Sequence, residues 1–307
     1  MTDLTPEEIG RRIDAQGLWE RALPVNWAVK PRGTAFPYFC TLLKGESPEV
    51  RLRLLLLEGW QTFHDYVRCR VDHDFGFYVS PSEFAHFELV VTGSGEAKVF
   101  RHDPGYVPLP LGDAPRRELC AKILWEAYGV MLRLENEPKL PLRYAGEKAM
   151  FARVETADGV WEDAALPIPE PRPHVESIRL PKKLMDRAKD LPIAEQERLE
   201  VDLALHLGLM TKEPRPRSAY LLAAVLADTG ERVVWEHASA DPETGLRGLW
   251  EGMPMHLLER LVQRGSIPGE IVVRSGRVFR LLRPLITDIP FKLSLRNRLP
   301  ALDKNLV

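Results

Sequence analysis

Six basic residues near the C-terminus have the types and spacing to contact phosphate groups. Three arginines recur at every third position of a predicted helix, and three more basic residues follow on the next strand and loop: Arg277, Arg280, Arg283, Lys292, Arg296 and Arg298. Such groups neutralise backbone phosphates, and the interleaved Phe279 and Phe291 supply rings on which bases stack. The pattern predicts a surface that binds nucleic acid. The simpler interpretation is a solvated face whose arginine stems cover apolar neighbours.

Three carboxylates in the same region suggest a second chemistry. Asp228 follows a predicted strand, Glu270 opens another, and Asp288 ends the helix after it. Carboxylates at strand ends can hold two divalent ions for phosphodiester hydrolysis. With a hairpin leading the domain, the arrangement resembles ribonuclease-H-like nucleases, and this resemblance implies Mg²⁺ or Mn²⁺ as the cofactor. Asp228 also precedes Thr229-Gly230, where a turn explains an aspartate locally. We prefer the turn and expect no catalytic residue, with the phosphodiesterase as the alternative.

Metal-capable side chains are concentrated once in the chain. His64, Asp65, Asp72, His73 and Asp74 fall within eleven residues. On a strand, however, Asp72 and Asp74 share one face and His73 points to the other, so these groups do not converge. The three cysteines form neither a C-x-x-C pair nor a zinc-ligand set. We therefore assign no metal and no cofactor.

Composition limits the class of protein. The chain has 307 residues, 45% of them hydrophobic, and a net charge of −2, which is typical of a globular protein and argues against a generic polyanion binder. Residues 270–307 are locally basic, with eight basic and three acidic residues. The sparse cysteines, the acidic N-terminus and the absence of a long apolar run predict a cytoplasmic protein with no membrane partner.

The C-terminal elements that must position these residues are strongly patterned. Residues 220–227 and 232–238 read as a hairpin around Thr229-Gly230. A helix follows over residues 246–261, which we expect Pro254 to divide and Gly265 to end. A short strand at 270–274, a helix at 276–288 capped by Ser275, and a strand at 291–295 complete the segment. The sequence predicts an α/β domain of order ββαβαβ.

The N-terminal elements are richer in strands. Glycine turns predict hairpins over residues 87–101 and 150–165, and apolar periodicity predicts a helix that begins after Asp113. Branched and aromatic residues favour strands at 50–57 and 60–71, although the run LRLLLLE at 52–58 could equally begin a helix. The seven tryptophans are expected to anchor cores. We predict a β-rich α+β domain here, and an α+β protein overall.

Prolines mark the boundaries. Residues 166–173 read LPIPEPRP, an extended connector, and residues 213–217 read EPRPR before an apolar run. The expected organisation is a domain at 1–166, a connector with a mostly helical, charged segment at 167–214, and a domain at 215–307. Whether the three glycine-turn hairpins reflect a duplication stays open.

The C-terminal domain resembles an uncharacterised bacterial family of a domain of unknown function. The residues that carry this resemblance are AYLLAAVLADTGERVVW at 219–235, SIPGEIVVRSGRVFRLLRPL at 266–285 and LPALD at 299–303, and the resemblance covers a segment of about ninety residues. It implies a soluble cytoplasmic bacterial protein and transfers no functional residue. Our hypothesis is a non-catalytic binding or assembly module whose partner is an unknown protein or nucleic acid.

Overall fold

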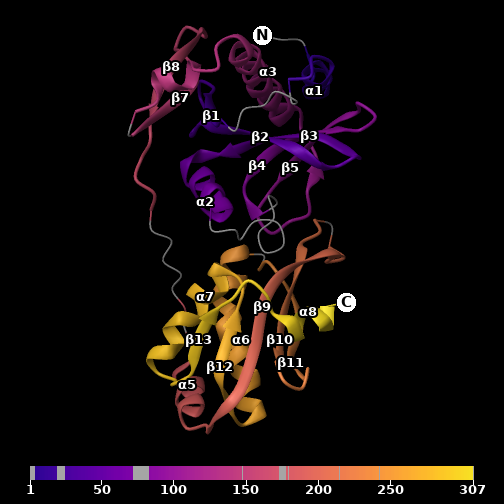
Figure 1. Ribbon diagram of the computed structural model, residues 1–307. Coiled ribbons are helices and arrows are strands. Elements are labelled where there is room, and N and C mark those ends of the chain that lie inside the picture. Colours follow the sequence, from indigo (N-terminus) through magenta and orange to yellow (C-terminus); the bar gives the residue numbers. More distant parts are fainter. Residues whose placement is uncertain are drawn as a thin grey trace. The chain divides into compact units, whose positions relative to one another are not determined.

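The chain forms two compact units whose segments alternate along the sequence (Figure 1). This computed structural model describes residues 4–18, 25–71, 83–146, 148–172, 178, 180–213, 215–241 and 243–306. Unit 1 comprises residues 1–67, 84–103 and 108–172, and unit 2 comprises residues 68–83, 104–107 and 173–307. The boundary expected near residue 215 therefore lies inside unit 2.

An eight-stranded sheet forms the centre of unit 1. In spatial order its strands are β6 (Leu109–Pro110), β5 (Ala97–His102), β4 (His86–Thr92), β3 (Val50–Glu58), β2 (Tyr38–Ser47), β1 (Trp27–Lys30), β7 (Ala149–Glu155) and β8 (Trp161–Pro167). Neighbours are antiparallel except β1 and β7, which pair in parallel with Ala28 opposite Ala152. Both expected hairpins are confirmed, and Gly95 and Gly159 supply positive φ angles at their turns.

Helices cover both faces of this sheet (Figure 1). Leu52, Leu54 and Leu56 of β3 face α1 (Pro6–Ala15) and α3 (Ala114–Asn136), the helix expected after Asp113. The short α4 (Leu140–Tyr144) follows and contacts β7.

The strand expected at residues 60–71 is wrong, because α2 (Gly59–Val71) is a helix. Gly59, at φ 78°, turns the chain out of β3. Trp60 and Phe63, three positions apart, then pack on Phe39, with ring centroids 5.0 and 4.6 Å away. This contact lies on the opposite side of the sheet from α3. It stabilises a helix in a segment whose residue types favour strands, because residues three apart lie on the same side of a helix.

Unit 2 is built on a five-stranded sheet. Its order is β11 (Arg232–Ser239), β10 (Ser218–Leu226), β9 (Ile193–Met210), β12 (Ile267–Val273) and β13 (Lys292–Leu295). The hairpin of β10 and β11 is confirmed, as is the parallel pairing of β12 with β13. The central strand β9 corrects the helical expectation for residues 193–210, so the element order from β9 onward is βββαβαβα.

The helices of unit 2 pack on both sides of the sheet. On one face lie α5 (Lys182–Lys189), α6 (Leu246–Arg264), α7 (Gly276–Leu282) and the 3₁₀ helix η2 (Arg283–Thr287), and on the other lies α8 (Pro300–Leu306). The expected caps at Ser275 and Gly265 are confirmed. Pro254 does not divide α6, whose buried leucines hold it against the sheet on both sides of the proline. None of the described helices combines the length and apolarity required to cross a membrane.

Candidate ligand-binding groove

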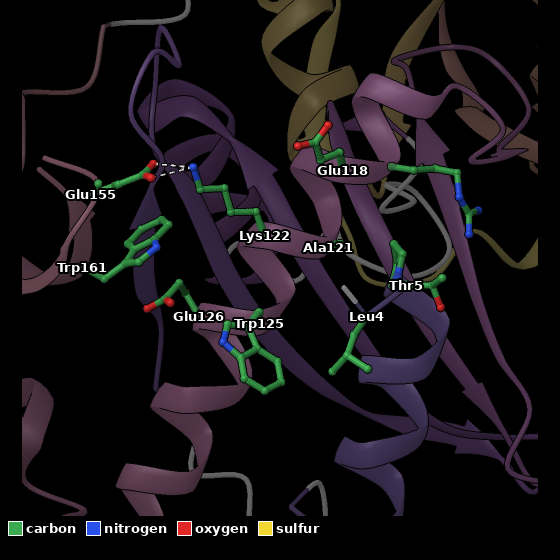
Figure 2. Close-up of a pocket in the computed structure, with 12 residues that line it drawn as sticks. Leu4, Thr5, Glu118, Ala121, Lys122, Trp125, Glu126, Glu155 and Trp161 are labelled. Atoms are coloured by element: carbon green, nitrogen blue, oxygen red, sulfur yellow. Dashed lines mark hydrogen bonds and ion pairs between the residues drawn. The ribbon is translucent and has the colours of Figure 1, made fainter. Parts of the chain in front are cut away.

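A groove with a volume of about 900 Å³ runs along α3 in unit 1 (Figure 2). Three parts of the chain line it: Leu4, Thr5 and Pro6 at the start of α1; Arg117, Glu118, Ala121, Lys122, Trp125 and Glu126 of α3; and Glu155, Gly159 and Trp161 of the β7–β8 hairpin. In Figure 2, Trp161 and Glu155 lie on one side, Leu4 and Thr5 lie on the other, and the labelled side chains of α3 lie between them. This volume is typical of a site for a small organic ligand.

Hydrogen bonds fix the wall formed by α1. Thr5 Oγ1 accepts from the Glu8 N–H at 3.2 Å, and Glu8 Oε2 accepts from the Thr5 N–H at 2.6 Å, a reciprocal capping box. Arg117 of α3 reaches Glu7 Oε2 at 2.6 Å. The N-terminus of α1 is therefore held beside α3.

Helical spacing determines which α3 side chains reach the groove. Arg117, Ala121 and Trp125 are four residues apart and lie on successive turns of one side of the helix. The buried side of α3 instead carries residues such as Ile123 and Leu124, which are fully inaccessible. Trp125 is only half-buried, so its indole presents apolar surface to the groove.

The opposite wall is organised around Glu155. Lys122 Nζ donates to Glu155 Oε1 at 2.7 Å, and the Arg32 N–H donates to Oε2 at 2.8 Å. Burial alone would raise the pKa of Glu155, but these two hydrogen bonds lower it. The ammonium of Lys122 also lies 5.8 Å from the ring centre of Trp161. The lysine thus connects α3, the hairpin and the second indole.

A second charged network supports the end of the groove. Arg153 donates to Glu126 at 3.1 Å and to Asp163 at 2.8 Å, and Arg133 contacts the same aspartate at 2.6 Å. Burial raises the pKa of Glu126 although Arg153 opposes the shift. Between the two indole rings, the groove therefore presents both carboxylate oxygens and cationic groups. The carboxylates only accept hydrogen bonds, and the cationic groups only donate them.

The groove does not follow from the sequence prediction, which takes the tryptophans mainly as core anchors. One observable signal was available. Trp125 falls outside the periodic apolar set of its helix, Cys120, Ile123, Leu124, Ala127, Tyr128 and Met131. An aromatic residue on the polar side of an amphipathic helix is a candidate for binding.

The predicted basic face is corrected at Arg277. Its side chain is only 15% exposed and pairs with Glu83 at 2.7 Å. Its guanidinium also lies 4.4 Å from the ring centre of Trp250. The Arg277 guanidinium is therefore bound by partners within unit 2, and its charge is not available to a polyanion. Arg280, Arg283 and Arg298 are exposed.

The two remaining basic residues lie on the other side of the sheet from α7. Lys292 and Arg296 approach the Glu270 carboxylate at 3.4 and 3.5 Å. Alternation along β12 places Glu270 on the same face as Val272, which packs in the cluster beneath α8. The opposite face of β12 contacts α7. The structure therefore does not gather the six predicted residues into one basic face.

The three candidate carboxylates are also not brought together. Asp228 lies in the exposed turn between β10 and β11, and Asp288 pairs with Lys189 at 2.6 Å. Glu270 accepts a hydrogen bond from Ser294 at 2.6 Å in addition to its two basic neighbours. Within the described part of the chain, these three form no cluster of metal-capable atoms.

The earlier histidine and aspartate cluster is only partly described. His64 Nδ1 lies 4.0 Å from Asp65 on α2, whereas Asp72, His73 and Asp74 lie outside the described residues. Cys40, Cys69 and Cys120 are buried and form no disulfide.

Comparison with known proteins finds one family match, which lies within the second unit. No curated protein and no solved structure matches the chain. The family resemblance expected from the sequence is confirmed over a longer segment than the ninety residues that suggested it. Residues 184–306, which contain the whole sheet of unit 2, match the family described as a domain of unknown function (DUF6930).

Proposed function

We propose that this chain is a non-catalytic binding protein whose ligand is a small, neutral, hydroxyl-bearing ring compound held in the groove of unit 1. The observation that carries the proposal is the pair of half-buried indoles, Trp125 and Trp161, beside charged groups that already have partners. An indole face packs against the apolar face of a ring. Hydroxyl groups both donate and accept hydrogen bonds, so they suit a site that alternates Lys122 with Glu126 and Glu155.

The charge balance of the groove supports a neutral ligand. Arg117, Lys122 and Glu126 each pair with a partner at 3.1 Å or less. A strongly charged ligand would have to compete with these ion pairs, whereas a hydroxyl group adds hydrogen bonds without displacing them. The three cysteines are buried and form no disulfide, which supports a reducing compartment such as the cytoplasm as the place of action.

Titration of the full chain with a panel of monosaccharides, oligosaccharides and nucleosides tests the proposal, with calorimetry and tryptophan fluorescence as readouts. We expect saturable binding of at least one compound. Trp125→Ala and Trp161→Ala should each raise its Kd at least tenfold, about 1.4 kcal/mol. Trp235→Phe in unit 2 is the matched control and should leave the Kd unchanged. No binding across the panel, or equal loss in the control, refutes the proposal.

An oligonucleotide arm of the same titration addresses the earlier hypothesis. Binding that weakens steeply with salt and is lost in Arg280→Glu/Arg283→Glu, but not in Trp125→Ala, would transfer the function to the exposed arginines of unit 2. We expect instead that Trp125→Ala and Trp161→Ala weaken binding of the ring compound, and that the double arginine variant does not.

A further inference from the structure

Two buried histidines and a glutamate converge on the face of the unit 1 sheet opposite α3. His86, Glu88 and His102 are 0%, 3% and 4% exposed, and their candidate ligand atoms all lie within 4.8 Å of one another. The groove described above lies along α3, so this cluster is a separate feature. Its position requires a reason, because buried polar side chains cost stability unless their hydrogen-bonding groups are satisfied.

The strand register brings the three side chains together. His86 of β4 is directly opposite His102 of β5, so the two share one face of the sheet. Glu88 is two residues after His86 and lies on that same face. The imidazole rings are 4.1 Å apart at their centres and inclined by 17°. The intervening Phe87 points into the core beneath α1 and α3, which confirms the alternation.

Existing hydrogen bonds leave a free lone pair on His86. Its Nδ1 lies 2.7 Å from the carbonyl oxygen of Phe84, which can only accept, so Nδ1 carries the proton. The lone pair is then on Nε2, a buried atom for which the described residues supply no hydrogen-bond partner. A carbonyl that orients an imidazole through its other nitrogen is the usual support of a metal-ligating histidine.

Glu88 and His102 complete the set. One oxygen of Glu88 accepts from Arg53 on β3, and the other lies 2.7 Å from His102 Nε2. The second ring nitrogen of His102, Nδ1, is buried without a partner among the described residues. A cation between His102 and Glu88 would take the position of the proton that they share. The bound ring stays a neutral imidazole when Nδ1 carries a proton: a doubly protonated His102 releases its Nε2 proton to solvent, and a neutral ring transfers that proton to Nδ1.

We propose that His86, Glu88 and His102 form a binding site for one divalent first-row transition-metal ion. Two imidazoles and one carboxylate are the donor set that Zn²⁺ and Fe²⁺ accept, and Ca²⁺ and Mg²⁺ prefer sites made of oxygen alone. Three protein ligands leave a coordination position open, as in catalytic zinc sites and unlike the closed four-ligand structural sites.

The test uses the full chain, stripped with a chelator and then titrated with Zn²⁺ and, for spectroscopy, Co²⁺. We expect one ion per chain by elemental analysis, a higher Tm with Zn²⁺, and visible Co²⁺ absorption typical of low coordination number. Glu88→Gln and His102→Gln should each raise the Kd for Zn²⁺ at least tenfold. His206→Ala/His237→Ala removes an exposed imidazole pair with ring centres 5.0 Å apart in unit 2, and should leave the Kd unchanged.

Three results would overturn the site: no ion retained by the wild-type chain, equal affinity in the ligand variants, or loss of affinity in the control. If a ligand variant fails to fold, the wild-type chain still decides. Co²⁺ must then shift the ring-proton NMR signals of His86 and His102, and a shift confined to His206 and His237 refutes the proposal.

Discussion

The buried thiols of Cys40 and Cys120 make unit 1 sensitive to alkaline conditions. Both are fully inaccessible, and burial raises the pKa of each above its ordinary value of 9.0. Burial likewise raises the pKa of Tyr38, which packs in the same core, to about 12. The folded chain therefore keeps protons that the unfolded chain releases once the pH exceeds the ordinary value.

We expect the free energy of unfolding of unit 1 to fall as the pH rises above 9, by about 1.4 kcal/mol per pH unit for each thiol. Urea denaturation of the full chain at a series of pH values measures the slope. Cys120→Ala should start about 1 kcal/mol less stable but show a shallower decline. An unchanged slope in this variant contradicts the assignment to Cys120.

Arg277 shows how one side chain on a basic helix can differ from its neighbours. Removing one partner of a buried ion pair leaves the other charge uncompensated, so Arg277→Ala should cost about 3 kcal/mol of stability. Arg280→Ala, on the exposed side of the same helix, should change it by less than about 0.5 kcal/mol. Thermal and urea unfolding compare the two variants. Equal effects would contradict a buried pair with Glu83.

Element by element, the sequence predicts what local rules specify. The three hairpins follow from glycine turns, and α3 follows from the spacing of residues such as Ile123 and Ala127, because both depend on neighbours in the chain. The central strand β9 was not predicted, although Leu199, Val201 and Leu203 alternate. The residues between them are Glu200 and Asp202, whose burial depends on partners more than seventy positions away.

The strand β9 and the terminal helix α8 depend on each other through Glu200. Its carboxylate is 3% exposed and accepts hydrogen bonds from the backbone N–H groups of Ala301 and Leu302, at 2.8 and 2.9 Å. Glu200→Ala would leave both donors unsatisfied and should cost about 2 kcal/mol. Glu200→Gln retains an acceptor oxygen and should recover part of that loss.

Hydrogen exchange checks this dependence directly. In Glu200→Ala, amides of α8 should exchange faster while those of β10 remain protected. Glu231→Ala, an exposed glutamate at the end of the β10–β11 turn, is the control. Faster exchange throughout the sheet would indicate that Glu200 supports more than α8.

At the scale of the whole molecule, the family match and the compact unit have different extents. The match covers residues 184–306, but unit 2 also contains residues 68–83 and 104–107, and these include the Glu83 that pairs with Arg277. The sequence pattern could not reveal this contribution, because these two segments of unit 2 lie between segments of unit 1 along the sequence.

A fragment of residues 178–307 retains all five strands of the unit 2 sheet but lacks Glu83. We expect it to fold with lower stability than the same unit in the full chain. In the fragment, Arg277→Ala should cost less than about 1 kcal/mol, because Arg277 has neither its partner nor its full burial. Urea denaturation of the full chain and of the fragment, each with and without Arg277→Ala, measures the loss of stability in the two proteins. The same large cost in each would contradict the role of Glu83.

The parallel pair of β1 and β7 sets the order in which unit 1 can be completed during synthesis. Ala28 meets Ala152 only after the ribosome has extended the nascent chain by more than a hundred residues. Until then β1 has a partner on one side only, and its other edge is open to strands from foreign chains. Chaperone protection of nascent chains should therefore matter most just before β7 emerges from the exit tunnel.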